Sequence, residues 1–165
     1  MHAVTTLETL RQSYPNAQVA TFTVDVACAP QTFYEVITDY SAYPQFVPSQ
    51  RAGRILRRDH GSPTERLEVA MELSLVGKAV RYELVAEGVA GHSLTWSLVS
   101  GDFMRENAGA WLLDELPNGH TRATFYMAVI LKGWLPGGLV NSLLTKTCPA
   151  TVQAFKAEAE RRATV

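Results

Sequence analysis

Residues 67–75 read Leu-Glu-Val-Ala-Met-Glu-Leu-Ser-Leu, and every second position of this stretch carries a large apolar side chain. Successive side chains of a β-strand point to opposite faces of a sheet, so this spacing predicts a strand with one buried face. Gly77-Lys78 follows the stretch and is typical of a turn. The apolar positions are Leu67, Val69, Met71, Leu73 and Leu75.

Stretches with the same alternation lie on both sides of residues 67–75, separated by short links that contain Gly, Pro, Asn or Asp. Together they make about seven strands, and links this short favour antiparallel hairpins. The other predicted strands contain or span residues 19–28, 51–59, 80–84, 94–98, 103–114 and 125–129.

The first two strands are separated by a helical segment. Phe33, Val36 and Ile37 share one face of a short helix predicted over residues 30–39, with Pro30 at its first position. A further helical turn is predicted over residues 42–47, just before Pro48. The sequence therefore predicts two short helices after the first strand.

The C-terminal part of the chain has a period of 3.6 residues and predicts one long helix that begins at Pro136. The helix must bury its apolar stripe on the one large sheet available. Pro149 lies inside the helix and removes a backbone donor, so we expect a kink near Cys148. The stripe is formed by Leu139, Val140, Leu143, Leu144, Cys148, Val152, Phe155 and Ala159.

The composition is that of one folded domain. The chain has 165 residues, of which 47% are hydrophobic and 19% charged, and this balance excludes a disordered chain. Its net charge of -1 lacks the basic surplus of a dedicated nucleic-acid binder. We expect residues 1–18 to form an N-terminal leader of uncertain order and residues 19–162 to form a single domain.

The two cysteines, Cys28 and Cys148, form neither a disulfide framework nor a spacing typical of zinc ligands. The first residues lack the basic start and apolar core of a signal peptide, and no stretch is apolar enough to predict a membrane span. We therefore expect a reducing, cytoplasmic setting.

Several short motifs occur in the same order as the predicted elements. With them, the chain resembles the START-like (SRPBCC) superfamily, and within it the polyketide cyclase/dehydrase and lipid transport branch that includes the coenzyme Q-binding proteins. The resemblance covers roughly residues 19–160. The motifs are Ala29-Pro30, Asp39-Tyr40, Tyr43-Pro44-Gln45-Phe46-Val47-Pro48, Gly101-Asp102-Phe103, Gly109-Ala110-Trp111, Gly119-His120-Thr121-Arg122 and Leu135-Pro136.

The resemblance implies an α+β helix-grip fold, in which a curved seven-stranded antiparallel sheet wraps around the long C-terminal helix. It also implies a cavity between sheet and helix that takes apolar molecules such as lipids, quinones or polyketides. The residues alone favour a filled core, and the resemblance shifts the expectation to a cavity. We expect a cavity of at least roughly 300 Å³, gated by the final helix and the Tyr43–Pro48 loop.

The candidate ligand-binding residues are the inward-facing positions of the predicted strands and helices, together with Gly109, which leaves room because it has no side chain. Trp96 and Trp111 are expected to point into the cavity, and Trp134 to lie nearer its rim. The candidates are Phe46, Val69, Met71, Tyr82, Trp96, Gly109, Trp111, Phe125, Met127, Leu139, Leu143 and Leu144.

Histidines at three predicted hairpin turns, His60, His92 and His120, raise the question of a metal site. Strands lie about 4.8 Å apart, so four strand spacings separate the first turn from the third, and we expect no metal. Motifs for nucleophilic catalysis or phosphate binding are not found. Polar side chains after the Gly101 turn, Asp102, Arg105 and Glu106, fit a solvated corner better than acid–base chemistry.

Four arginines at 51, 54, 57 and 58 form the one basic cluster of the sequence. On an edge strand they would guard against pairing with another sheet. Alternatively, they could bind anionic lipid headgroups at a membrane surface or ribosomal RNA, and the net charge favours RNA less.

The functional expectation is non-catalytic binding of a hydrophobic small molecule, either an isoprenoid quinone or a lipid. No cofactor is required for this function, although a quinone or lipid can be bound. Two alternatives remain open: a polyketide cyclase or aromatase, which needs polar groups in the cavity, and a ribosome- or RNA-associated module.

Overall fold

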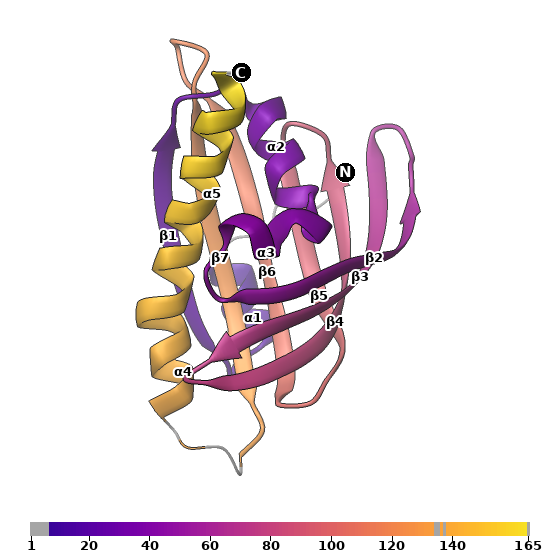
Figure 1. Cartoon of the computed structure of the whole chain (residues 1–165), viewed down its shortest axis with the longest axis vertical. Helices are drawn as coiled ribbons and strands as arrows, with labels where there is room; N and C mark the ends of the chain where they lie inside the picture. The colour runs from indigo at the N-terminus through magenta and orange to yellow at the C-terminus, as the bar shows by residue number, and fades with distance from the viewer. Residues whose placement is uncertain (1–6, 134–135, 137, 165) are drawn as a thin grey trace.

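The computed structural model describes residues 7–133, 136 and 138–164. Within this part of the chain, seven strands form one antiparallel sheet with the order β1-β7-β6-β5-β4-β3-β2 (Figure 1). Strands β2 to β7 are therefore a meander, and β1 closes the far side by pairing with β7. The strands are β1 (Gln18–Val26), β2 (Gln50–Asp59), β3 (Thr64–Leu75), β4 (Lys78–Val89), β5 (Ser93–Gly101), β6 (Met104–Glu115) and β7 (Thr121–Leu131).

The alternation that predicted the strands is also the alternation of burial. In β3 every second residue from Glu65 to Leu75 is buried, and β4 continues the pattern from Val80 to Gly88. The inward-facing apolar positions join one hydrophobic core with the helices. β1 ends at Val26, two residues earlier than expected, because the chain turns at Cys28, whose amide donates to the backbone oxygen of Val26.

Two short helical segments follow β1, as predicted. They are α2 (Pro30–Thr38) and the turn pair η1 (Tyr40–Ala42) and α3 (Tyr43–Phe46). α2 buries Phe33, Val36 and Ile37 completely. Asp39 ends α2, and its carboxylate accepts a hydrogen bond of 3.0 Å from Arg162, near the end of the C-terminal helix.

The C-terminal helix lies along the concave face of the sheet (Figure 1). It begins at Gly138 rather than at Pro136 and has three parts, namely α4 (Gly138–Ser142), the π-helical turn η2 (Leu143–Thr147) and α5 (Cys148–Ala163). Pro149 cannot donate to the carbonyl of Thr145, and the helix widens just before it, so the amide of Cys148 donates to Leu143, five residues back. Next to Cys148, where a kink was expected, the structure has this π turn.

The opposite face of the sheet is partly covered by α1 (Leu7–Ser13), which lies behind it in Figure 1. Leu10 of α1 packs on Ala108 and Ala128 in a small second cluster. At the other side of the sheet, β2 is an edge strand, which is where the arginine cluster was expected. No helix among the described residues is long and apolar enough to cross a membrane.

Candidate functional site

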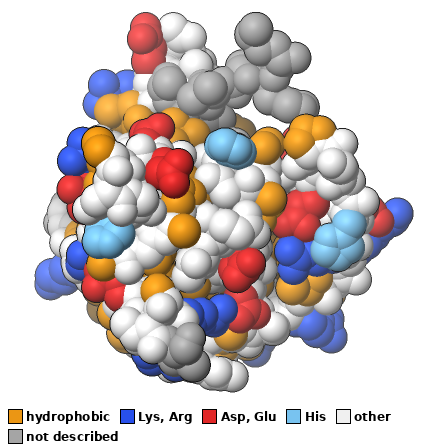
Figure 2. Space-filling view, turned by 90° about the horizontal axis from the view of Figure 1, so that it is seen from above, with side chains coloured by type: hydrophobic (Ala, Val, Ile, Leu, Met, Phe, Trp, Pro, Cys, Tyr) orange, Lys and Arg blue, Asp and Glu red, His pale blue; other side chains and the backbone are white. Residues whose placement is uncertain are grey.

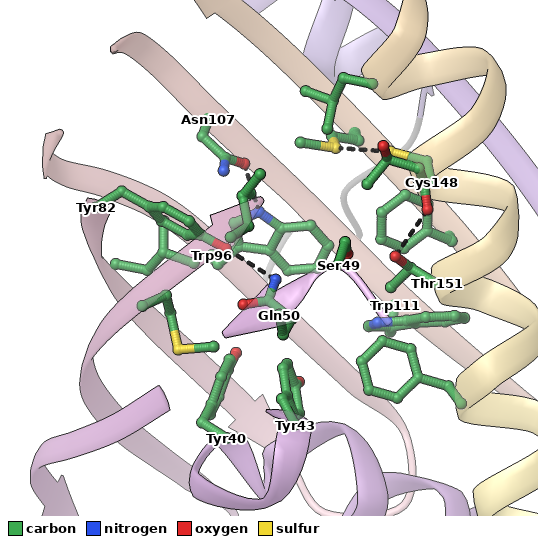
Figure 3. Close-up of a pocket in the computed structure, with 18 of the residues that line it drawn as sticks. Tyr40, Tyr43, Ser49, Gln50, Tyr82, Trp96, Asn107, Trp111, Cys148 and Thr151 are labelled. Carbon is green, nitrogen blue, oxygen red and sulfur yellow. Dashed lines mark hydrogen bonds between the residues drawn. The ribbon is translucent and has the colours of Figure 1, made fainter. Parts of the chain in front are cut away.

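A cavity of about 100 Å³ lies between the concave face of the sheet and the η2–α5 part of the C-terminal helix (Figure 3). Its walls come from three places: strands β3 to β7, the η1–α3 segment with the start of β2, and one face of η2 and α5. The lining residues are Tyr40, Tyr43, Ser49, Gln50, Met71, Leu73, Tyr82, Leu84, Leu94, Trp96, Asn107, Trp111, Phe125, Met127, Leu143, Thr147, Cys148, Thr151 and Phe155.

Seven of the twelve candidate residues line this cavity. They are Met71, Tyr82, Trp96, Trp111, Phe125, Met127 and Leu143. The other five do not line it, and they are Phe46, Val69, Gly109, Leu139 and Leu144. Trp134 was expected at the rim of the cavity, but it lies outside the described residues, so this expectation stays a prediction.

The five remaining candidates pack outside the cavity lining. Val69, Leu139 and Leu144 belong to the buried core. Phe46 packs its ring on Phe155 at 5.7 Å, between α3 and α5. A Cβ atom on Gly109 would lie 2.9 Å from Cε2 of Trp96, so the space above this glycine holds the indole and leaves no room for a ligand.

The cavity is smaller than the roughly 300 Å³ expected at the low end of ligand sites. The cavity is smaller than expected because aromatic rings from α3, β6 and α5 pack against one another and fill part of the space. The ring centroid of Phe155 lies 4.9 Å from that of Tyr43 and 5.7 Å from that of Trp111. The space that remains is of the order that holds a single aromatic ring.

Neutral polar groups lie at two places in the wall. Near the far side, Nε1 of Trp96 donates to the amide oxygen of Asn107 at 3.0 Å. At the start of β2, Nε2 of Gln50 donates to the hydroxyl of Tyr82 at 3.1 Å (Figure 3). The hydroxyl of Ser49 and the amide oxygen of Gln50 are buried and have no hydrogen-bond partner among the described residues.

The lining contains no Asp, Glu, Lys, Arg or His among the described residues. Burial raises the pKa of Tyr82 to about 12 and the pKa of Cys148 to about 12, so both groups stay protonated at neutral pH. Burial likewise raises the pKa of Tyr40 and of Tyr43. The wall can therefore offer neutral hydrogen bonds and apolar contact, and it holds no group that would act as a base at neutral pH.

Sequence reasoning missed twelve of the lining residues. For seven of them a signal was present: three belong to the inward strand positions, two to the helix stripe, and two to the Asp-Tyr and Tyr-Pro motifs. The missed residues are Tyr40, Tyr43, Ser49, Gln50, Leu73, Leu84, Leu94, Asn107, Thr147, Cys148, Thr151 and Phe155.

The alternative candidates for chemistry lie outside the cavity. His60, His92 and His120 are all exposed, and Figure 2 shows histidine side chains separated from one another at the upper end of the molecule. No three His, Cys, Asp or Glu side chains of the described residues gather closely enough to hold a metal ion. Asp102, between β5 and β6, and Arg105, in β6, are exposed, Glu106 is half-buried, and none of the three lines the cavity.

A polar cluster lies between α2 and the β2–β3 hairpin, and it includes one of the four arginines, Arg58. The buried carboxylate of Glu65 accepts hydrogen bonds from Tyr34 at 2.5 Å and from two nitrogens of Arg58 at 3.0 and 3.1 Å. Burial alone would raise the pKa of Glu65, but these hydrogen bonds outweigh it and the pKa is lowered. His60 lies 3.3 Å from the same carboxylate. The cluster therefore links α2 to strands β2 and β3 at the edge of the sheet.

With the fold and the cavity described, the class of the protein follows from comparison with known families. Residues 26–156 match the model of the family described as polyketide cyclase/dehydrase and lipid transport. The match covers well over half of the chain, so the chain belongs to this family. The family and the helix-grip fold fit binding of hydrophobic small molecules or polyketide cyclase activity.

Solved structures share the fold. A START superfamily protein from Mycobacterium smegmatis superposes with a TM-score of 0.75 at 22% identity, over 87% of this chain and 98% of that one. The Zhui aromatase/cyclase from Streptomyces sp. R1128 gives a TM-score of 0.76 at 16% identity, over 89% and 96% of the two chains. Identities this low establish the fold alone.

Among curated proteins, the chain is similar to the persistence and stress-resistance toxin PasT of Escherichia coli O6:H1, with 25% identity over 135 residues and 82% of each chain. It is 24% identical to the ribosome association toxin RatA of Escherichia coli K12, over the same share of both chains.

Proposed function

We propose that this protein binds a neutral hydrophobic small molecule in the cavity between the sheet and the C-terminal helix, without transforming it. The observation that carries the proposal is the composition of the wall. It combines large apolar and aromatic side chains with a few neutral polar groups, which is the usual make-up of a small-molecule site. The family description, which includes lipid transport, supports the same function.

An isoprenoid quinone or a lipid-like compound is the ligand class that we propose. A quinone ring is planar and of the size that the cavity holds, and the aromatic wall from Trp96, Phe125 and Trp111 suits stacking. The apolar tail would extend past the ring-sized space, so its binding requires side chains or the η2 turn to move.

A cyclase or aromatase is the alternative that the family name raises. Such an enzyme must shift protons during ring closure, and groups with a pKa near the working pH do this best. The described lining offers only neutral groups, and Tyr82 and Cys148 have raised pKa values. We therefore expect no turnover of an aromatic polyketide thioester, measured by mass spectrometry of the products.

Ribosome association is the alternative that the curated relatives raise. The arginines of β2 are the expected contact, but three of them already have partners: Arg57 pairs with Asp59 at 2.9 Å, Arg58 pairs with Glu65, and Arg51 donates to the hydroxyl of Ser74. We expect no cosedimentation with ribosomes in a sucrose gradient. Cosedimentation that is lost at high salt would favour the alternative.

The proposal is tested by tryptophan fluorescence in a Trp134→Phe background, where Trp96 and Trp111 are the remaining reporters. A quinone accepts electrons from an excited indole, so a short-chain ubiquinone analogue should quench the emission saturably. The Trp96→Phe, Trp111→Phe double variant should lose this saturable quenching. Native mass spectrometry with organic extraction identifies any compound that copurifies. Linear, unsaturable quenching would contradict a quinone site.

A further inference from the structure

Two buried polar atoms in the cavity wall lack a partner. The Ser49 hydroxyl oxygen and the Gln50 amide oxygen each expose less than 1 Å² and have no hydrogen bond among the described residues. Both residues line the cavity, and Figure 3 shows them together at the start of β2. Buried polar atoms are nearly always paired, and an unpaired one costs free energy. The pair therefore marks a place where a further group would be stabilised.

Several other polar groups of the wall already have partners. The indole nitrogen of Trp96 donates to Asn107, and the amide nitrogen of Asn107 lies 3.5 Å from the sulfur of Met104. The hydroxyl of Thr151 donates to the backbone oxygen of Thr147 at 2.8 Å. Among the described residues, the fully buried side-chain atoms without a partner thus both lie at one end of the cavity, at Ser49 and Gln50.

We infer that the ligand carries a neutral hydroxyl group, and that this hydroxyl is held by Ser49 and Gln50. The inference rests on the proposed function and adds to it the chemistry and the orientation of the ligand. An amide oxygen can only accept a hydrogen bond, whereas a serine hydroxyl can donate as well as accept. A ligand group that donates to Gln50 and accepts from Ser49 pairs both atoms, and a hydroxyl is the smallest organic group that does so.

The same wall excludes charged forms of the ligand. The described lining holds no cationic side chain to pair with a carboxylate or phenolate, and burial of an unpaired charge is strongly unfavourable. Much of the rest of the wall is apolar, around Leu84, Leu94 and Met127, so most of the remainder of the ligand is apolar. Phenols and hydroquinones meet these demands. The oxygens of a quinone can only accept hydrogen bonds, whereas a hydroquinone can also donate one to Gln50, so the site prefers the reduced form of an isoprenoid quinone.

The test compares three probes of one shape: p-cresol, toluene and 4-methylanisole. In a purely apolar cavity, p-cresol binds more weakly than toluene, because its hydroxyl gives up water and gains no partner. With Ser49 and Gln50 as partners, we expect the order to reverse, with p-cresol at least about threefold tighter than toluene and than the methyl ether. Affinities are read from amide and indole cross-peak shifts in a 15N-labelled sample, which also locate the binding to the cavity.

Variants of the two partners make the test specific. Ser49→Ala and Gln50→Met should each restore the apolar order, in which toluene is the tighter ligand. Ser100→Ala is the matched control, since Ser100 is exposed on β5, and it should keep the reversed order. As a second measurement, a short-chain ubiquinol should bind tighter than its quinone under anaerobic conditions, by a similar factor.

The outcomes separate this inference from the proposed function. Toluene binding in the cavity more tightly than p-cresol in the wild type would overturn the hydroxyl assignment and leave an apolar binding site. A reversed order that persists in both Ser49→Ala and Gln50→Met would overturn the role of these residues. Absence of cavity shifts with all three probes would overturn the binding function itself.

Discussion

Replacement of Gly109 by alanine tests how the cavity wall is built. A Cβ atom at this position would overlap the backbone oxygen of Tyr126, on the neighbouring strand, and the six-membered ring of Trp96. The Tyr126 oxygen is part of the β6–β7 ladder and cannot rotate away, so either the strands separate or the backbone twists. The indole must also rise from the sheet.

The size of the effect follows from this geometry. Overpacking of a tight core site costs about 1–3 kcal/mol, and the involvement of a backbone atom favours a value of about 2 kcal/mol for Gly109→Ala. For a chain of 165 residues, that corresponds to a fall in Tm of about 4–8 °C. The displaced indole would also lose its hydrogen bond to Asn107 and enter the cavity, so affinity for the probes should fall together with stability.

The assay is urea and thermal unfolding followed by circular dichroism, with Gly138→Ala as the matched control. Gly138 is an exposed residue of α4, and an added Cβ there would meet no atom within 4 Å, so its Tm should not fall. The Gly109→Ala, Trp96→Leu double variant should show a favourable coupling of about 1 kcal/mol, because the indole no longer competes for the space. A Gly109→Ala protein with the wild-type Tm would refute this account of the wall.

Three further predictions concern single side chains. Phe155→Ala should lower the free energy of unfolding by about 3–5 kcal/mol and enlarge the cavity, and urea unfolding together with binding of larger ring probes checks both effects. Glu65 has a lowered pKa in the folded protein, so its contribution is present above its unfolded value of 4.5 and is lost as the pH falls. Glu65→Gln should therefore be less stable at neutral pH and flatten the decline in acid, as measured by urea unfolding between pH 7 and 3. Burial raises the pKa of Cys148 to about 12, so a thiol reagent should modify the native protein very slowly at pH 8 and the unfolded chain rapidly.

The strands, and which side chains of each strand face the core, could be predicted because both depend on the local order of apolar and polar residues. In residues 67–75 the period of two assigns each side chain to a face, and all five apolar positions are indeed buried. Trp96 and Trp111 were placed in the cavity by the same argument, and both line it. Pro149 predicted a break in the helix because the loss of one donor depends on sequence alone.

The polar part of the site could not be predicted in this way. Ser49 and Gln50 follow Pro48 at the junction of a turn and an edge strand, where no periodicity assigns a direction. Their orientation depends on pairing of β2 with β3, including an irregular register between Gln50 and Ala52. The cavity volume was overestimated for a related reason, since it depends on how the rings of Tyr43 and Phe155 pack, which the sequence does not specify.

The two walls of the cavity differ in how firmly they are built. The sheet wall rests on continuous ladders, such as the twelve residue pairs of β3 and β4, and is displaced only if many hydrogen bonds break together. The α3 side is held to α5 by rings packed edge to face, and the Arg162–Asp39 ion pair links the end of α2 to α5. The helical wall contains the η2 turn and Pro149, where the regular hydrogen bonds are already interrupted. A ligand larger than one ring must displace part of the wall, and the least costly part to displace is the α4–η2 segment beside Leu143 and Thr147.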